Sequence, residues 1–215
     1  MRVLYKKFIF CTLALCLPVC IAAPCDAAVV LRFDADPAIG GGQSDRDVGL
    51  GESFDVSLFM DITDATNVAS YTLSVRYDKT KLAFVSGSDP LPAGFQFGDT
   101  SVIATSVPGE TFDDIDGIDG TSFAGGVTGP ISFEIASFTF RAISDQRISP
   151  FDITAGLFGK PQNEFRNSAF GVIDQGQISV QGANINVITA IPEPTFVGLL
   201  MLGGTIVVSQ RRRRR

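Results

Sequence analysis

The clearest hydropathy pattern in the chain is an alternation of apolar and polar side chains over residues 54–63. The apolar members are Phe54, Val56, Leu58, Met60 and Ile62. Successive side chains of a strand point to opposite faces, so a period of two predicts a half-buried strand. One apolar and one polar face is typical of a strand in an antiparallel sandwich.

A second alternating segment, residues 71–77, predicts the next strand. Its apolar members are Tyr71, Leu73, Val75 and Tyr77. We therefore expect both tyrosines in the core. Ser74 has the opposite parity, so it should face solvent, and its replacement should be nearly neutral. The turn at residues 78–81 leads into a further strand at residues 82–86.

Residues 131–143 form a longer apolar segment whose alternation changes phase. Ile131, Phe133 and Ile135 have one parity, and Phe138, Phe140 and Ala142 have the other. A β-bulge near Ala136 and Ser137 would restore a single buried face. Later strands are predicted at residues 152–158 and 176–180.

The remaining pattern supports an all-β class. The stretch 35–47 is a glycine-rich loop between the first two strands, and residues 181–190 read as a last strand that runs into a linker. No ten-residue segment between the two ends shows a helical period, and there is no internal repeat. The predicted core includes Phe54, Val56, Leu58, Leu73, Val75, Phe138 and Phe140.

The first 28 residues have the order of a secretory signal peptide. Basic residues at the start precede an apolar stretch from Phe8 to about Ala23, and small residues follow. The alternatives are an uncleaved anchor, for which the apolar run is short, and a lipoprotein cut before Cys20 or Cys25. The four cysteines all lie in the first 25 residues. Cleavage after Ala27 or Ala28 would therefore leave a mature protein without a disulfide or a thiol nucleophile.

The opposite end carries an apolar run followed by five arginines. Residues 195–210 would span about 24 Å as a helix, somewhat less than the bilayer core of about 30 Å. The arginines are Arg211, Arg212, Arg213, Arg214 and Arg215. Such a cluster favours the cytoplasmic side of a membrane. The sequence therefore predicts a single short transmembrane helix, with the body of the chain on the outer side.

Composition excludes several classes of function. The chain has no His and no Trp, so a Ser-His-Asp triad and histidine metal sites are absent. Residues 29–188 hold nine basic and 21 acidic side chains, a formal charge of about −12. This field repels phosphate backbones, and nucleic acid is not an expected partner. A glycosidase-type carboxylate pair stays open as a third possibility, but no stretch indicates one, and we expect no enzyme activity.

The densest acidic segment is TFDDIDGIDGTSF, whose aspartates are Asp113, Asp114, Asp116 and Asp119. Calcium prefers clustered oxygen ligands, and Gly117 and Gly120 would let the chain wrap tightly. The EF-hand pattern fails, because Ile118, Asp119 and Gly125 stand where it needs an oxygen ligand, Gly and Glu. The alternative is a solvated acidic loop, which the failed pattern favours. No other cofactor is predicted.

Sugar-binding faces use exposed aromatic rings as stacking platforms. Tyr71 and Tyr77 share the parity of core residues, so phenylalanines are the remaining candidates. Phe95 and Phe97, in the segment LPAGFQFGD, are two such residues. Core packing is the alternative for both.

The C-terminal end resembles the PEP-CTERM sorting signal. Its elements are Pro192, Glu193 and Pro194, then a short apolar helix with glycines, then the arginine cluster 211–215. The resemblance implies recognition by exosortase, an inner-membrane cysteine protease, in a Gram-negative bacterium that makes exopolysaccharide. The tail would hold the exported protein at the inner membrane transiently, until cleavage releases it to the cell surface or biofilm matrix.

The body resembles a cohesin-type domain. The similarity rests on the alternating strand at 54–63, the Tyr77–Asp78 pair after the next strand, the Lys81–Leu82 pair and the strand that holds Phe84, Val85 and Ser86. It implies a nine-stranded jelly-roll sandwich, a fold shared with some carbohydrate-binding modules. The context differs from that of scaffold cohesins, because the chain has a single copy.

Three segments and three functional possibilities follow. We expect a signal peptide at 1–28, a cohesin-like β-sandwich at 29–188 and the sorting signal at 189–215. The leading expectation is an exported, non-enzymatic cell-surface or extracellular-matrix protein with a binding domain. The alternatives are an exopolysaccharide-binding module and a secreted glycan hydrolase. The ligand, a polysaccharide or a surface protein, is not encoded in a recognisable motif.

Overall fold

The computed structural model describes residues 28–98, 102–149 and 152–189, and these residues form an all-β fold. The strands in chain order are β1 (Val29–Asp34), β2 (Asp45–Gly49), β3 (Ser53–Ile62), β4 (Asn67–Val68), β5 (Ser70–Asp78), β6 (Leu82–Ser88), β7 (Ile103–Ser106), β8 (Phe112–Thr121), β9 (Val127–Thr128), β10 (Ile131–Ala142), β11 (Ile153–Gly156), β12 (Glu164–Arg166), β13 (Ile178–Gln181) and β14 (Asn184–Ile188). The helical structure in the described part of the chain is one short 3₁₀ turn, Gln175–Gln177.

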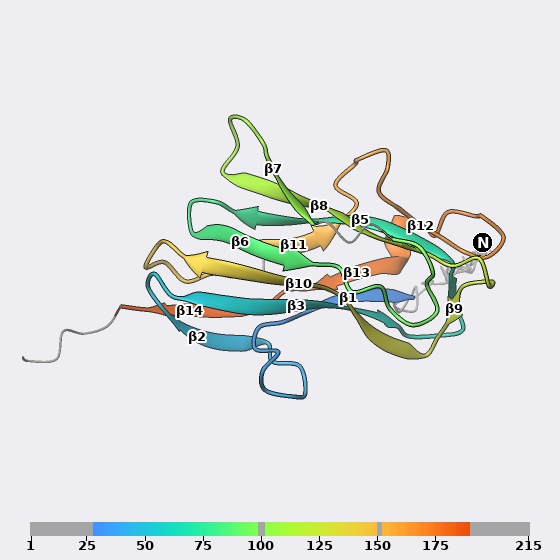
Figure 1. The fold of residues 1–215 in the computed structure, drawn as a ribbon, viewed down its shortest axis with the longest axis horizontal. Coiled ribbons are helices and arrows are strands. Elements are labelled where there is room, and N and C mark those ends of the chain that lie inside the picture. The colour runs from blue at the N-terminus through green and yellow to red at the C-terminus, as the bar shows by residue number, and fades with distance from the viewer. Residues whose placement is uncertain (1–27, 99–101, 150–151, 190–215) are drawn as a thin grey trace, which may run out of the picture.

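Two five-stranded sheets form a sandwich (Figure 1). The first sheet has the order β13-β1-β3-β10-β6, and the second has the order β11-β5-β8-β7, with β12 also paired to β5. Figure 1 shows β7, β8 and β5 in one layer and β1 and β3 in the other. The predicted all-β sandwich is confirmed, and the two sheets are consistent with the expected jelly roll, with ten strands rather than about nine.

The end of the described chain pairs back onto its beginning. β13 lies parallel to β1, and β14 lies parallel to β2. The other strand pairs of the two principal sheets are antiparallel. The glycine-rich segment predicted as a loop is partly a strand, because its last residues, 45–47, begin β2.

The alternating segments behave as the sequence predicts. In β3 and β5 the apolar parity points between the sheets, and both tyrosines of β5 are buried. All seven predicted core residues are buried: Phe54, Val56, Leu58, Leu73, Val75, Phe138 and Phe140. Because apolar burial is the dominant favourable term in folding, the packing of these side chains holds the two sheets together.

The phase change in the long apolar segment is also present. The pairing of β10 with β3 shifts register between Glu134 and Ala136, which places the extra residue at Ile135. Ile135 and Ala136 are both buried. The predicted bulge is therefore real, and it lies about one residue before the predicted position.

The expectation for Ser74 is wrong. Its side chain is fully buried, although it has the polar parity of β5. The Ser74 hydroxyl donates to Asp116 at 2.5 Å and accepts from the Asn163 amide at 2.8 Å. The segment 157–163 therefore covers this part of the outer face. Ser74 is buried beneath it, although its parity predicts exposure to solvent.

The predicted signal peptide, except for its last residue Ala28, lies outside the described residues, as do the sorting motif and the transmembrane helix. This applies to Pro192, Glu193 and Pro194, to the apolar run, and to the arginine cluster 211–215. Within the described ranges, no helix is long and apolar enough to cross a bilayer.

Candidate functional site

The acidic segment 113–119 is a strand and not a loop, because it forms most of β8. Three of its aspartates pair with basic side chains. Asp113 accepts from Lys79 at 2.7 Å, and Asp114 accepts from the Arg76 Nε at 2.8 Å. Each of these carboxylates is neutralised by a basic neighbour. Together they do not converge on a common centre.

Lys160 joins two of these aspartates. Its ammonium group lies 3.0 Å from Asp114 and 2.5 Å from Asp116. Asp114 is nearly completely buried, and Arg76 binds it with two nitrogens. The ion pairs therefore attach the segment that carries Lys160 to the outer face of β5 and β8. We call Arg76, Asp114, Asp116 and Lys160 the ionic cluster.

The pairing shifts the pKa values of Asp114 and Lys160. Burial alone would raise the pKa of Asp114, but hydrogen bonds from Arg76 and Lys160 outweigh it and hold this pKa below its usual range. Burial alone would lower the pKa of Lys160, but its hydrogen bonds to Asp116 and Asp114 raise it above the ordinary value. Both groups therefore remain charged at neutral pH.

The two glycines have roles other than calcium wrapping. Gly117 has a φ of 86° at the register shift between β5 and β8, so it accommodates a β-bulge. Gly120 faces Tyr71, and a Cβ there would lie 2.5 Å from the ring. In the described part of the chain, no group of three or more potential ligand residues is placed to hold a metal ion. The aspartates of β8 do not support the calcium hypothesis.

An aromatic pair encloses Arg76. Its guanidinium carbon lies 3.9 Å from the centroid of the Phe112 ring and 4.3 Å from that of Phe158. Phe158 has a φ of 47°, a left-handed conformation that costs a side-chain-bearing residue about 1–2 kcal/mol. The cation–π contacts offset part of this cost.

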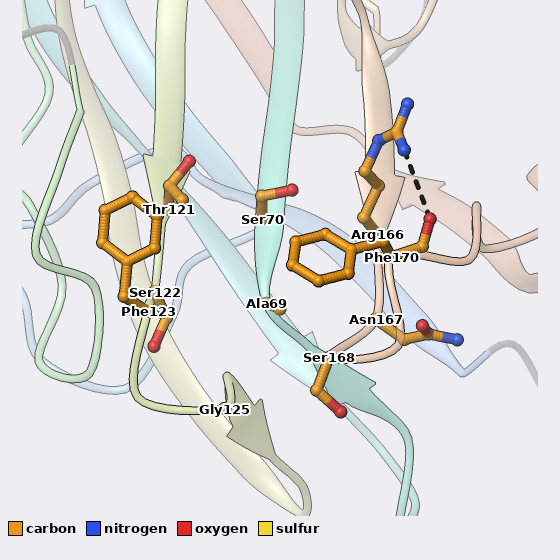
Figure 2. A pocket seen from close by; sticks show the side chains of 10 residues that line it. All are labelled: Ala69, Ser70, Thr121, Ser122, Phe123, Gly125, Arg166, Asn167, Ser168 and Phe170. Carbon is orange, nitrogen blue, oxygen red and sulfur yellow. Dashed lines mark hydrogen bonds between the residues drawn. The ribbon is translucent and has the colours of Figure 1, made fainter.

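A groove lies at the opposite end of the same outer face, at the start of β5 and the end of β8. It has a volume of about 290 Å³. Its lining residues are Ala69, Ser70, Thr121, Ser122, Phe123, Gly125, Arg166, Asn167, Ser168 and Phe170. Figure 2 shows the Phe123 and Phe170 rings on either side of Ser70. We call this the aromatic groove.

Phe170 forms one wall of the aromatic groove. It is 79% exposed and has a φ of 60°, so it combines backbone strain with an unburied ring. The turn around it is closed by hydrogen bonds: Phe170 N donates to Asn167 O at 2.9 Å, and Arg166 donates to Phe170 O at 3.2 Å. The Asn167 side chain also accepts from Ala169 N and Gly171 N. The exposed ring is therefore held in place by its backbone.

Phe123 forms the other wall and is 75% exposed. Its backbone N–H donates to the Gln96 side chain at 2.9 Å. Its ring meets that of Phe97 edge to face, with centroids 4.8 Å apart. Of the two predicted stacking candidates, Phe95 is buried in the core, while Phe97 is exposed and supports Phe123.

The floor between the walls is polar and uncharged. Ser70 and Thr121 are direct cross-strand partners in β5 and β8. Neither hydroxyl has a hydrogen-bond partner among the described residues. The cation at the rim, Arg166, is paired with Glu164 through Nε and Nη2. Among the residues that the structure describes, no Asp or Glu lines the groove, and the two flanking carboxyl groups of a glycan hydrolase are not found in that lining.

Sequence reasoning missed Phe123 and Phe170. Both stand alone among small residues, in SFAGG and NSAFGV, where no apolar neighbour of alternating parity accounts for them. An isolated aromatic side chain in a loop of small residues is the signal that could have identified them.

No protein-family model matches the chain, and no curated protein matches it. Among solved structures it is similar to cohesin domains. The solution structure of CaCohA2 from Clostridium acetobutylicum has 13% identity and a TM-score of 0.48, with 78% of this chain and 95% of that chain covered. The sixth cohesin of Acetivibrio cellulolyticus scaffoldin B, in complex with a Cel5 dockerin, has 12% identity and a TM-score of 0.47, covering 75% and 100%.

A non-cellulosomal cohesin from the archaeon Archaeoglobus fulgidus has 10% identity and a TM-score of 0.45, with 77% of this chain and 94% of that chain covered. At these identities and TM-scores, the similarity assigns no site and no partner to the chain.

Proposed function

We propose that the chain is an exported, non-catalytic binding protein of the cell surface or extracellular matrix, and that the aromatic groove is its binding site. The observation that carries this proposal is the pair of exposed rings, Phe123 and Phe170, on opposite walls of one groove. Exposed aromatic side chains are costly in water and are enriched at binding sites. Held in place by their loops, they lose little freedom when a partner binds.

The absence of suitable chemistry in the groove supports a binding role. Hydrolysis of a glycosidic bond requires two carboxyl groups that flank it, and no carboxylate of the described residues lines the groove. The whole chain also lacks His. The groove presents hydroxyls, aromatic faces and one paired arginine, which can hold a ligand but cannot transfer its protons efficiently.

Both ends of the chain support export and sorting. The proposed signal peptide, residues 1–28, directs the body across the inner membrane. The proposed sorting signal, Pro192–Glu193–Pro194 with the apolar run and the arginine cluster, holds it there until exosortase cleaves it. The body is then released to the surface or matrix. The support for this step is the order of motifs in the sequence.

Sorting is tested by intact-mass measurement of the secreted protein from a host with and without exosortase. We expect the mature product to lack both the first two dozen or so residues and Arg211–Arg215. A secreted product that retains these arginines would contradict the sorting proposal and leave the binding proposal untouched.

Binding is tested by retention of the secreted protein on the native extracellular matrix. The double variant Phe123→Ser with Phe170→Ser should lose most of the retention. The matched control is Val85→Ser, because Val85 is exposed but lies on β6 of the other sheet. Equal retention of the wild type and the double variant would rule out the aromatic groove as the binding site.

A further inference from the structure

The aromatic groove has two rigid rings at fixed positions. The Phe170 turn is closed by the Asn167 side chain and by Arg166. It is also tied to β4, since Ser168 N donates to the Asn67 side chain at 2.8 Å. Phe123 is fixed by Gln96 and Phe97. Both platforms are therefore formed before any ligand arrives, and flat apolar faces can stack on them.

The polar groups between the rings restrict the ligand. An entirely apolar partner would cover the Ser70 and Thr121 hydroxyls and leave them without water or a hydrogen-bond partner, which is unfavourable. A ligand that carries hydroxyl groups next to apolar C–H faces would satisfy both the floor and the walls. The C–H hydrogens on the face of a sugar ring carry a partial positive charge that matches the negative face of an aromatic ring.

The charges exclude ionic ligands. A cationic peptide would find no carboxylate among the described lining residues. An anionic polymer would meet a body with a formal charge of about −12 over residues 29–188 and would find only Arg166, which Glu164 already neutralises. A neutral ligand meets neither penalty.

The size of the groove fits one ring-sized unit. Its volume of about 290 Å³ lies at the lower end of the range for small-molecule sites, about 300–1,000 Å³. A groove of this volume holds one such unit, and the rest of a longer molecule would lie outside it. A sugar unit within a longer chain therefore suits the groove better than a large compact ligand.

We infer that the aromatic groove binds one neutral pyranose unit of a polysaccharide, stacked against Phe123 and Phe170 with its hydroxyls on Ser70 and Thr121. This inference rests on the proposed function, because it names the ligand class of the same site. The binding is salt-independent and needs no metal ion.

The test is affinity electrophoresis of the secreted protein, or of the detergent-solubilised full chain where the tail is retained. The gels contain hydroxyethylcellulose, dextran, galactomannan or xylan as neutral probes, and alginate as the anionic probe. At least one neutral gel should retard the wild type, and retardation should persist in 0.5 M salt and in chelator. Phe123→Ser and Phe170→Ser should each weaken that association about five- to tenfold.

Two further variants test the floor, and one is a control. Ser70→Ala and Thr121→Val should each weaken association about threefold, and Val85→Ser should leave it unchanged. Thermal unfolding of every variant confirms that the fold is retained.

Each other outcome overturns the inference. If no neutral gel retards the wild type, or if the aromatic variants bind as it does, the groove is not a neutral sugar site. Retardation in alginate alone that salt abolishes would point to an anionic ligand. Groove-dependent capture of a matrix protein without glycan binding would overturn the inference but preserve the proposed function. No retention on whole matrix would remove both.

Discussion

The two ends of the outer face of the second sheet each carry a strained phenylalanine, but its ring is packed at one end and exposed at the other. Each end carries a loop with a phenylalanine in the left-handed conformation, Phe158 at 47° and Phe170 at 60°. At the first end the ring stacks on Arg76, and the loop is attached by the ionic cluster. At the second end the ring is 79% exposed and faces Phe123 across a groove.

The two strained phenylalanines therefore have different roles: Phe158 stabilises the fold, and Phe170 presents its ring to a ligand. A strained residue persists only where its surroundings hold it. At Phe158, contacts within the chain offset part of the strain. At Phe170 the turn holds the backbone, but the ring gains little from the domain itself. The ionic cluster should therefore determine stability, and the aromatic groove should determine binding.

The largest expected effect is that of Arg76→Ala. The change removes two hydrogen bonds to the buried Asp114 carboxylate and leaves Lys160 as its remaining charged partner. Breaking a buried ion pair costs about 3–5 kcal/mol, and because Lys160 still pairs with Asp114 we expect a loss of about 3 kcal/mol. Chemical denaturation measures the loss, and matrix retention should be unchanged in the folded fraction.

The control for Arg76→Ala is Arg147→Ala. Arg147 forms an exposed pair with Asp45 at 4.0 Å, and exposed pairs contribute about 0–1 kcal/mol. Equal losses of stability from the two changes would contradict a structural role for the ionic cluster.

The next effect is that of Ser74→Ala, which tests the corrected position of this residue. The change leaves the Asn163 amide and the Asp116 carboxylate without the Ser74 hydroxyl. An unsatisfied buried polar group costs about 1–3 kcal/mol. Thr72→Ala on the same parity of β5 is the control and should cost about 1 kcal/mol or less. If the two variants had the same unfolding midpoint, the result would contradict the buried position of Ser74.

The sequence predicts most of the sandwich because the alternation in β3, β5 and β10 is a local signal. It fails at residues 113–119, since aspartate and glycine are depleted in strands and the partners that neutralise the aspartates come from elsewhere in the chain. Arg76 and Lys160 precede and follow Asp114 by about 40 residues. No local pattern records that these side chains meet.

The aromatic groove could not be predicted from the sequence either, because its two walls are distant in the chain and meet only in the fold. Phe123 follows β8 and Phe170 follows β12, and both strands pair with β5. This shared partner brings the two loops together across nearly 50 residues of sequence. The sequence showed isolated aromatic side chains, but only the strand order places them on one groove.

A smaller effect is expected in the pH dependence of stability, which should differ between the ionic cluster and the aromatic groove. The pKa of Asp114 is lowered in the folded state, so its contribution to stability is full above the unfolded carboxyl pKa of about 3.9. The contribution is lost as the pH falls through the lower folded value. The difference in unfolding free energy between wild type and Asp114→Asn should therefore be constant from about pH 5 to 7 and shrink below about pH 4. Phe170→Ser should instead follow the wild type in parallel, and a converging Phe170→Ser curve would contradict the separation of the two ends.

The smallest and most discriminating effect comes from placing glycine at each strained position. Glycine adopts positive φ without steric cost but loses more chain entropy on folding, by roughly 0.5–1 kcal/mol. At Phe170 the relieved strain of about 1–2 kcal/mol exceeds this entropy, so Phe170→Gly should leave stability unchanged or raise it by up to about 1 kcal/mol while matrix retention falls. At Phe158 glycine relieves the same strain but also removes the stacking on Arg76, so Phe158→Gly should be less stable than Phe170→Gly by roughly 1 kcal/mol and should leave retention intact. Thermal unfolding and matrix retention, measured on both variants, therefore distinguish the two positions. If Phe170→Gly were the destabilising variant, its ring would belong to the fold, and the assignment of the groove to a ligand would lose its main support.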